Sequence, residues 1–177
     1  MKQTIILIIF SLILSFTNAQ VKVYSDKSQS SITYLMNHPL HSWTGVSKEV
    51  NSIIVTDEIK STISQVAVSV RIASFDSKNA NRDSHAMEST EAIKYPSISF
   101  SSSQIENLGN KLKVSGIMQF HGVSQTISFE AEKSMIKDKA KITGNFSITL
   151  TQFKIDPPSL LGLAVDDEIK VSFSLVY

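Results

Sequence analysis

The stretch STISQVAVSVRIA, residues 61–73, decides the fold class, because its apolar and polar side chains alternate with a period of two. Val66, Val68 and Val70 fall on one side of an extended chain, and their more polar neighbours fall on the other. Such alternation is typical of a β-strand with one face in a core and the other in solvent. The stretch therefore predicts a half-buried strand.

The same alternation recurs on both sides of this stretch. It is strong in KITGNFSITL and EIKVSFSLVY, residues 141–150 and 168–177, and weaker in residues 30–36, 50–55, 97–105, 111–119 and 123–130. A turn signal, NLGNK, separates two of these segments. Together they predict about eight antiparallel strands in an all-β fold.

Residues 76–95, DSKNANRDSHAMESTEAIKY, break the pattern. Ala, Met, Glu and Lys recur there without alternation, which predicts a short helical segment over about residues 77–94, ended before Pro96. Long strands in so short a chain favour the tilted strands of a barrel over the shorter strands of a sandwich. The predicted fold is a closed antiparallel barrel, whose interior is either filled or holds one small ligand.

The first residues, MKQTIILIIFSLILSFTNA, have the layout of a secretory signal peptide. Lys2 precedes an apolar run, and the segment ends in small residues that suit cleavage after Ala19. The run is shorter than the roughly 20 apolar residues that a membrane-spanning helix needs. We expect a signal peptide over residues 1–19, one domain over residues 20–177, and a periplasmic or secreted protein; an uncleaved anchor is the alternative.

Charge and cysteine content exclude several functions. Removal of Lys2 takes Lys plus Arg from 17 to 16, against 16 Asp plus Glu, so the mature chain has no net charge to attract nucleic acid or an anionic membrane surface. The chain has no cysteine, which excludes disulfides and thiolate metal ligands. An exported domain of this kind must be held together by its core.

NHPLHSW, residues 37–43, contains two of the four histidines. His38 and His41 would point to opposite faces of a continuous strand, and Pro39 argues against a helix, so they would converge on a metal ion only across a turn. The competing interpretation is that a strand ends near His38, turns at Pro39 and restarts at Trp43, which places both histidines at a barrel rim. The sequence predicts no metal site.

The segment NRDSHAMES offers a second group of polar side chains. On a helix, Arg82 and His85 share a face, as do His85 and Glu88. Such a group, with Asp83, suits a structural network or acid/base catalysis. A metal-dependent or His/Asp enzyme at the barrel rim is therefore the alternative function, although no GxSxG motif is present.

Bulky side chains predominate on the strand faces that are predicted to point away from solvent. They either fill an ordinary core, as in a ligand-free structural or stress-response domain, or line an elongated apolar tunnel. The candidate ligand-binding residues are Tyr34, Met36, Trp43, Val68, Val70, Phe100, Met118, Phe120, Phe129, Phe146, Ile148 and Phe173. Whether Trp43 faces the tunnel or seals its rim stays open at this point.

Several motifs in order along the chain resemble the YceI-like family. VSVRIASFDSKNANRDSH resembles the family's Arg-Asp-x-His after a Ser-rich turn, and KYPSISF its Tyr-Pro and following Phe. VSGIMQFHGVSQTISFE resembles its His-Gly strand pair, and LLGLAVDDEIKVSFSL its last strand. The residues that carry these structural motifs are His38, Arg82, Asp83, His85, Tyr95, Pro96, His121 and Gly122.

The resemblance implies a lipocalin-like barrel that binds a polyisoprenoid, an isoprenoid quinone or a fatty-acid-like lipid. On this basis we expect a non-enzymatic carrier without a cofactor, whose partner is a hydrophobic small molecule. Arg82, Asp83 and His85 would fix the helical cap to the barrel, and His121 with Gly122 would form a tight hairpin end. The oligomeric state is left open, with a dimer as one option.

Overall fold

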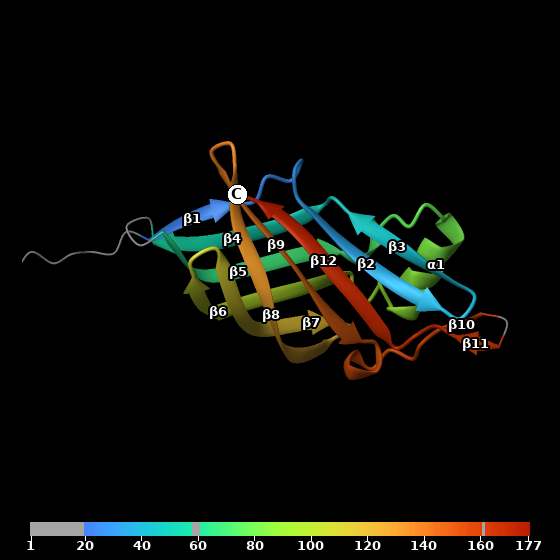
Figure 1. Ribbon diagram of the computed structural model, residues 1–177. Helices are drawn as coiled ribbons and strands as arrows, with labels where there is room; N and C mark the ends of the chain where they lie inside the picture. Colours follow the sequence, from blue (N-terminus) through green and yellow to red (C-terminus); the bar gives the residue numbers. More distant parts are fainter. Residues whose placement is uncertain (1–19, 58–60, 161) are drawn as a thin grey trace, which may run out of the picture.

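The computed structural model describes residues 20–57, 61–160 and 162–177, and most of these residues lie in strands. Their sheet strands are β1 (Gln20–Tyr24), β2 (Ser31–His38), β3 (His41–Ser47), β4 (Val50–Asp57), β5 (Thr62–Arg71), β6 (Ser97–Leu108), β7 (Lys111–Phe120), β8 (Val123–Ile136), β9 (Lys139–Thr149) and β12 (Glu168–Val176). They form one antiparallel sheet in the order β1-β4-β5-β6-β7-β8-β9-β12-β2-β3 (Figure 1). A separate hairpin pairs β10 (Ser159–Leu160) with β11 (Leu163–Ala164).

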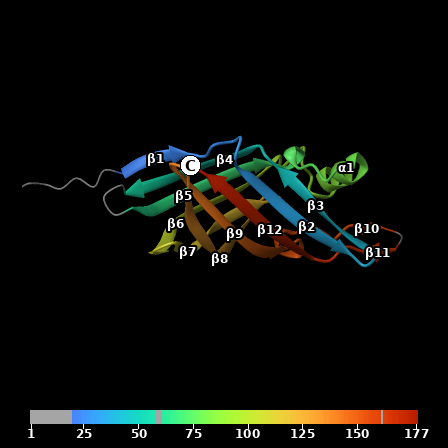
Figure 2. The ribbon, with the colours of Figure 1, turned by 45° about the horizontal axis from the view of Figure 1, so that its top comes forward.

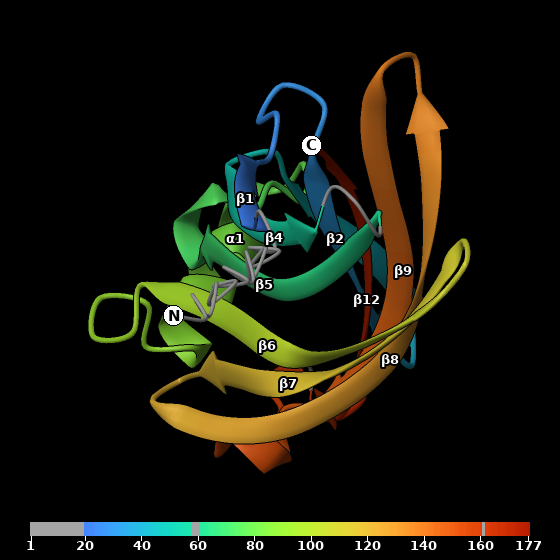
Figure 3. The same ribbon diagram turned by 90° about the vertical axis from the view of Figure 1, so that its left-hand side faces the viewer.

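The sheet curls strongly, so that its two halves face each other (Figure 3). Hydrogen bonds from Ser25 N to Ser52 O and from Asp26 N to Val176 O link the chain after β1 to β4 and to β12. The described strands make no ladder between β3 and either β1 or β4. The all-β, antiparallel, barrel-like prediction is confirmed, but the sheet has ten strands rather than about eight, and its backbone pairing leaves a half-barrel.

The edge of β3 is occupied by the segment that precedes the helix. Val46 and Asp76 exchange two backbone hydrogen bonds, of 3.1 and 3.0 Å. Residue 76 thus takes the position on β3 that a closing strand would need. This is a physical reason why the backbone ladder stops at β3.

The helix α1 (Ala80–Ser89) is shorter than the predicted segment, 77–94. Asn79 caps it, because its side chain accepts a hydrogen bond of 3.1 Å from Arg82 N. Just before this cap, Lys78 has a positive φ of 63°. After the helix, residues 90–94 form turns. No helix among the described residues is long and apolar enough to cross a membrane.

Buried side chains form two clusters, most of whose members lie on strands of the sheet. We name them by a member: the Phe153 cluster contains Met36, Ile72, Met118, Phe120, Ile148, Leu150, Phe153, Ile155, Val165 and Ile169. The Tyr177 cluster contains Val50, Ile54, Ile63, Leu112, Val114, Ala131, Ile142, Leu175 and Tyr177. Met87 and Ala92, from α1 and the turn after it, pack on the first cluster, which therefore marks the α1 end.

Candidate binding cavity

The inner face of the curled sheet surrounds a cavity of about 800 Å³. Every candidate ligand-binding residue of the sequence analysis lies along its wall: Tyr34, Met36, Trp43, Val68, Val70, Phe100, Met118, Phe120, Phe129, Phe146, Ile148 and Phe173. The cavity also extends along both buried clusters, from Ile155 to Tyr177. The interior is thus hollow in its middle, and contact of these residues with a ligand stays a prediction.

Sequence reasoning missed part of the wall. Additional apolar residues on it include Ile54, Ile63, Ile72, Leu112, Val114, Ala131, Ile142, Leu150, Ile169, Val171 and Leu175. Most of these residues lie on the buried faces of predicted strands, so the apolar–polar alternation of the sequence could have identified them. Further missed residues come from α1 and its two ends, where they add a mostly polar border: Asn79, Asn81, Ala86, Ser89 and Thr90.

Figures 1 and 2 place α1 and the β10–β11 hairpin at the same end of the sheet as the β2–β3 turn. The residues of α1 that line the cavity therefore lie at this end, together with His38 and His41. The opposite end of the cavity is lined by the Tyr177 cluster. An apolar interior with polar groups at one end can hold an amphipathic molecule in one orientation.

Trp43 is half-buried on β3 and lines the cavity. The guanidinium of Arg82 lies 5.0 Å from the centroid of its ring, a cation–π contact between α1 and the sheet. The His41 ring packs beside it, with 5.3 Å between centroids. Trp43 therefore lines the cavity and also contacts the helix, and its contact with a ligand stays a prediction.

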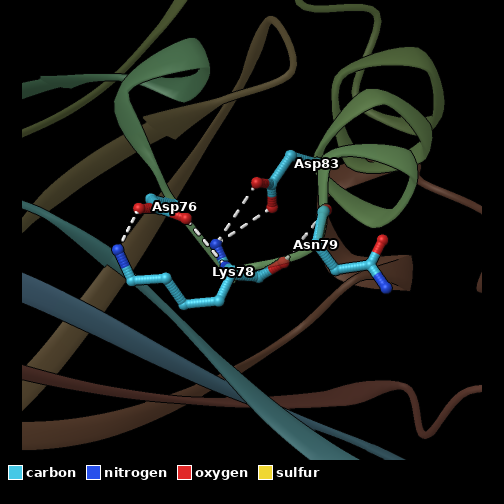
Figure 4. Close-up of polar contacts among 5 residues, drawn as sticks. Asp76, Lys78, Asn79 and Asp83 are labelled. Atoms are coloured by element: carbon cyan, nitrogen blue, oxygen red, sulfur yellow. Dashed lines mark hydrogen bonds and ion pairs between the residues drawn. The ribbon is translucent and has the colours of Figure 1, made fainter.

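Asp83 organises the loop before α1 (Figure 4). Its carboxylate accepts two hydrogen bonds from Ser77 N, at 3.1 and 3.3 Å, while Arg82 Nε donates to Ser77 Oγ at 3.1 Å. Asp76 similarly accepts from Lys78, and these contacts lower the pKa of Asp76. The cap is thus tied to its own loop by Asp83 and to the sheet by Arg82.

His85 does not share this arrangement. Its side chain is 77% exposed and forms an ion-pair contact with Glu88 of the same helix, with 3.7 Å between Nδ1 and Oε2. It borders the cavity but has no contact with a strand among its hydrogen bonds and ion pairs. The expectation that it fixes the cap to the barrel therefore has no support from its position.

His38 and His41 face each other, contrary to the interpretation that strand geometry separates them. Pro39 and Leu40 form the turn between β2 and β3, so the two histidines are direct partners with ring centroids 5.5 Å apart. His38 is buried, its Nδ1 accepts from Leu40 N and its Nε2 donates to Leu163 O, each at 3.2 Å. Nδ1 therefore stabilises the β2–β3 turn itself, and Nε2 connects this hairpin to the β10–β11 hairpin.

Among the described residues, no group of three or more His, Cys, Asp or Glu side chains is arranged to hold a metal ion.

His121 and Gly122 form the turn between β7 and β8, and both have positive φ, 50° and 72°. Two such residues make the twisted turn that a tight antiparallel hairpin favours. The His121 ring packs edge-on against Tyr95, which precedes Pro96, and its Nδ1 donates to Phe153 O at 3.0 Å. This hairpin end is thereby fixed to the segment after α1 and to the Phe153 cluster.

Two tyrosines on the cavity wall have perturbed ionisation. Burial raises the pKa of Tyr34, partly opposed by the Trp43 side chain. Burial also raises the pKa of Tyr177 to about 12, opposed by its hydrogen bond with Ser52. Ser52 Oγ donates to Ala67 O at 3.2 Å and accepts from the Tyr177 hydroxyl at 2.5 Å. Both phenols are therefore neutral near pH 7.

A curled antiparallel sheet with a helix at one end and an apolar cavity along its inner face defines a class of all-β half-barrel proteins. Within it, this chain belongs to the YceI-like domain family, whose model matches residues 24–177. Protein YceI of Salmonella newport (strain SL254) is 25% identical over 117 residues, which are 64% of this chain. The chain spans 61% of the length of that curated relative.

Solved structures share the fold. The Campylobacter jejuni YceI protein is 26% identical with a TM-score of 0.64, covering 75% of this chain and 82% of that one. Burkholderia cenocepacia BcnA has a TM-score of 0.77 at 21% identity, covering 86% and 99%. A polyisoprenoid binding domain from Saccharophagus degradans has a TM-score of 0.71 at 12% identity, covering 91% and 98%. The last two likenesses concern the fold alone.

Proposed function

We propose that this protein is a non-enzymatic carrier that encloses one long apolar ligand, a polyisoprenoid or a related lipid, in its cavity. The observation that carries the proposal is the cavity of about 800 Å³ with an apolar wall. Its volume falls within the roughly 300–1,000 Å³ of typical ligand sites. Burial of an apolar chain there gains about 25 cal/mol per Å² removed from water.

The comparisons support the same class of ligand. The Saccharophagus degradans domain with this fold is described as polyisoprenoid binding. Polar side chains at the α1 end of this chain already have partners within the protein: His38 bonds two backbone groups, Asp83 the backbone N–H of Ser77, and Arg82 contacts the Trp43 ring. Such groups border a ligand site without forming an arrangement of nucleophile and base, which favours binding over catalysis.

Lipid extraction from the purified protein followed by mass spectrometry tests the proposal. We expect one lipid class to be enriched over the bulk lipids of the host, and delipidated protein to take up a prenyl alcohol with a change in Trp43 fluorescence. Val68→Phe, which places a larger side chain in the cavity and narrows it, should weaken both signals. The matched control is Ala67→Phe, on the exposed side of β5 at the neighbouring position. Protein that neither retains nor takes up any lipid would refute the function.

Export to the periplasm or medium is part of this proposal and has its own test. The predicted signal peptide, residues 1–19, lies outside the described residues, and β1 begins at Gln20, directly after the predicted cleavage site. We expect the intact mass of protein recovered from a periplasmic fraction to correspond to a chain that starts at Gln20. Recovery of the full-length chain from the cytoplasm would contradict export.

A further inference from the structure

Four phenylalanine side chains meet in the middle of the cavity. Phe129 on β8 lies 5.4 Å from Phe100, 5.1 Å from Phe146 and 5.6 Å from Phe173, measured between ring centroids. The three partners of Phe129 come from different strands: Phe100 from β6, Phe146 from β9 and Phe173 from β12. All four phenylalanines line the cavity. We call them the phenylalanine band.

The band spans strands that are not direct neighbours. Phe100 and Phe129 are separated by β7, and Phe129 and Phe173 by β9. Alternate strands lie roughly 9.5 Å apart, so these rings meet only if each leans across the strand between them. An ordinary side chain at the crossing point would prevent this.

Glycines occupy the crossing points. A Cβ atom at Gly116 of β7 would lie 2.6 Å from Phe100 Cζ and 2.4 Å from Ser101 O. A Cβ at Gly144 of β9 would lie 2.6 Å from Phe173 Cζ and 2.9 Å from its Cε1. The Phe100 and Phe173 rings therefore pack closely on Gly116 and Gly144, and both rings line the cavity.

The band lies between the two ends of the cavity. Phe100 packs on both buried clusters, Phe146 on the Phe153 cluster, and Phe129 and Phe173 on the Tyr177 cluster. Along β12, Phe173 lies four positions beyond Ile169 of the α1 end, about 13 Å at about 3.3 Å per residue. Because residues of both clusters line the same cavity, a chain that enters at α1 must pass the band to reach Tyr177.

We infer that the phenylalanine band determines how long an apolar chain the cavity accepts, with Gly116 and Gly144 holding it open. This inference rests on the proposed carrier function and adds the residues that set ligand length. Rings that stay on their glycines let a long chain continue into the Tyr177 cluster. A ring lifted off its glycine can move only into the cavity, and it then stops the chain at that depth.

Gly144→Ala is the test, because its methyl group must displace the Phe173 ring. The probes are the prenyl alcohols geraniol, farnesol and geranylgeraniol and fatty alcohols of matching length, titrated against Trp43, the single tryptophan. In the wild type, each additional buried methylene should raise affinity about fourfold, equivalent to about 0.8 kcal/mol. In Gly144→Ala, we expect unchanged geraniol binding and about tenfold or greater loss for geranylgeraniol.

Two variants control for general damage. Gly144→Ala combined with Phe173→Leu removes the displaced ring and should restore long-chain binding. Gly45→Ala makes the same kind of clash near α1, since its Cβ would lie 2.3 Å from Tyr34 Cε1, and should weaken all probes alike. Circular dichroism and thermal unfolding verify that each variant is folded.

The outcomes separate the two proposals. Wild-type protein that binds none of the probes would refute the carrier function, and the inference with it. Wild-type binding combined with parallel losses for every probe in Gly144→Ala, or with no rescue by Phe173→Leu, would refute the role of the band alone. A length-dependent loss in Gly45→Ala equal to that in Gly144→Ala would also refute it.

Discussion

The two ends of the cavity use polar groups differently. At the α1 end, Arg82, Asp83 and His85 are half-buried or exposed on a helix whose Met87 packs against the Phe153 cluster. At the opposite end, the hydroxyls of Ser52 and Tyr177 hydrogen-bond to each other inside an apolar cluster. Exposed polar contacts contribute little to stability, whereas buried apolar area and buried hydrogen bonds contribute more. The α1 end should therefore owe its stability to Phe153 rather than to its polar cap.

Phe153→Ala should have the largest effect. The side chain is fully buried and its ring lies 5.4 Å from Phe120, so its removal should lower the free energy of unfolding by about 3–5 kcal/mol. Urea unfolding followed by circular dichroism measures the loss. The matched control is Phe146→Ala, a half-buried ring on the cavity wall, which should cost clearly less. Equal losses would mean that the cavity wall is packed as densely as the cluster behind it.

Tyr177 should make the stability of the other end depend on alkaline pH. Burial raises its folded-state pKa from 10.0 to about 12, so its contribution is complete below pH 10 and is lost as pH rises through about 12. Between these two values the wild type should lose about 2 kcal/mol more than Tyr177→Phe, which cannot ionise at this position. Urea unfolding of both proteins across this range measures the difference. Parallel pH profiles would show that the phenol is not buried in the folded protein.

Gly122→Ala tests the turn that joins the α1 end to Tyr95. The substitution forces an L side chain to a φ of 72° and places its Cβ 2.6 Å from the Tyr95 ring, which should cost about 1–3 kcal/mol. Gly109→Ala, at a φ of 68° with open space around it, controls for the backbone conformation alone and should cost less. Thermal unfolding compares the two variants. A larger loss for Gly109→Ala would contradict the packing of Tyr95 on this turn.

The sequence placed its twelve candidate residues on the cavity wall because burial on one face of a strand imposes a period of two. Val66, Val68 and Val70 lie on the cavity side of β5, as their alternation indicates. The same logic placed Phe129 and Phe146 on the wall without knowledge of strand order. The face of the sheet that a side chain occupies depends only on its position along its own strand, so the alternation within that strand is sufficient to predict it.

The unpredicted features depend on contacts between distant segments. Bonding of Val46 to Asp76 ends the ladder at β3, and nothing near either residue encodes that partner. The turn at Pro39 was predicted, but the direct pairing of His38 with His41 across it was not, because the strand was expected to restart at Trp43. The seating of Phe173 on Gly144 likewise requires the register of β9 with β12. Register and edge pairing are set by the whole sheet.

Arg82→Met should have the smallest effect and test most directly how little the polar cap contributes. The substitution removes the cation–π contact with Trp43 and the hydrogen bond to Ser77 Oγ but keeps an apolar stem, so we expect a loss of about 0.5–1 kcal/mol. The environment of Trp43 should change at the same time, visible as a shift in its fluorescence maximum. His85→Ala, at an exposed position without a strand contact, should change neither quantity. A loss for Arg82→Met as large as that for Phe153→Ala would place the stability of the α1 end in its polar cap and reverse the contrast between the two ends of the cavity.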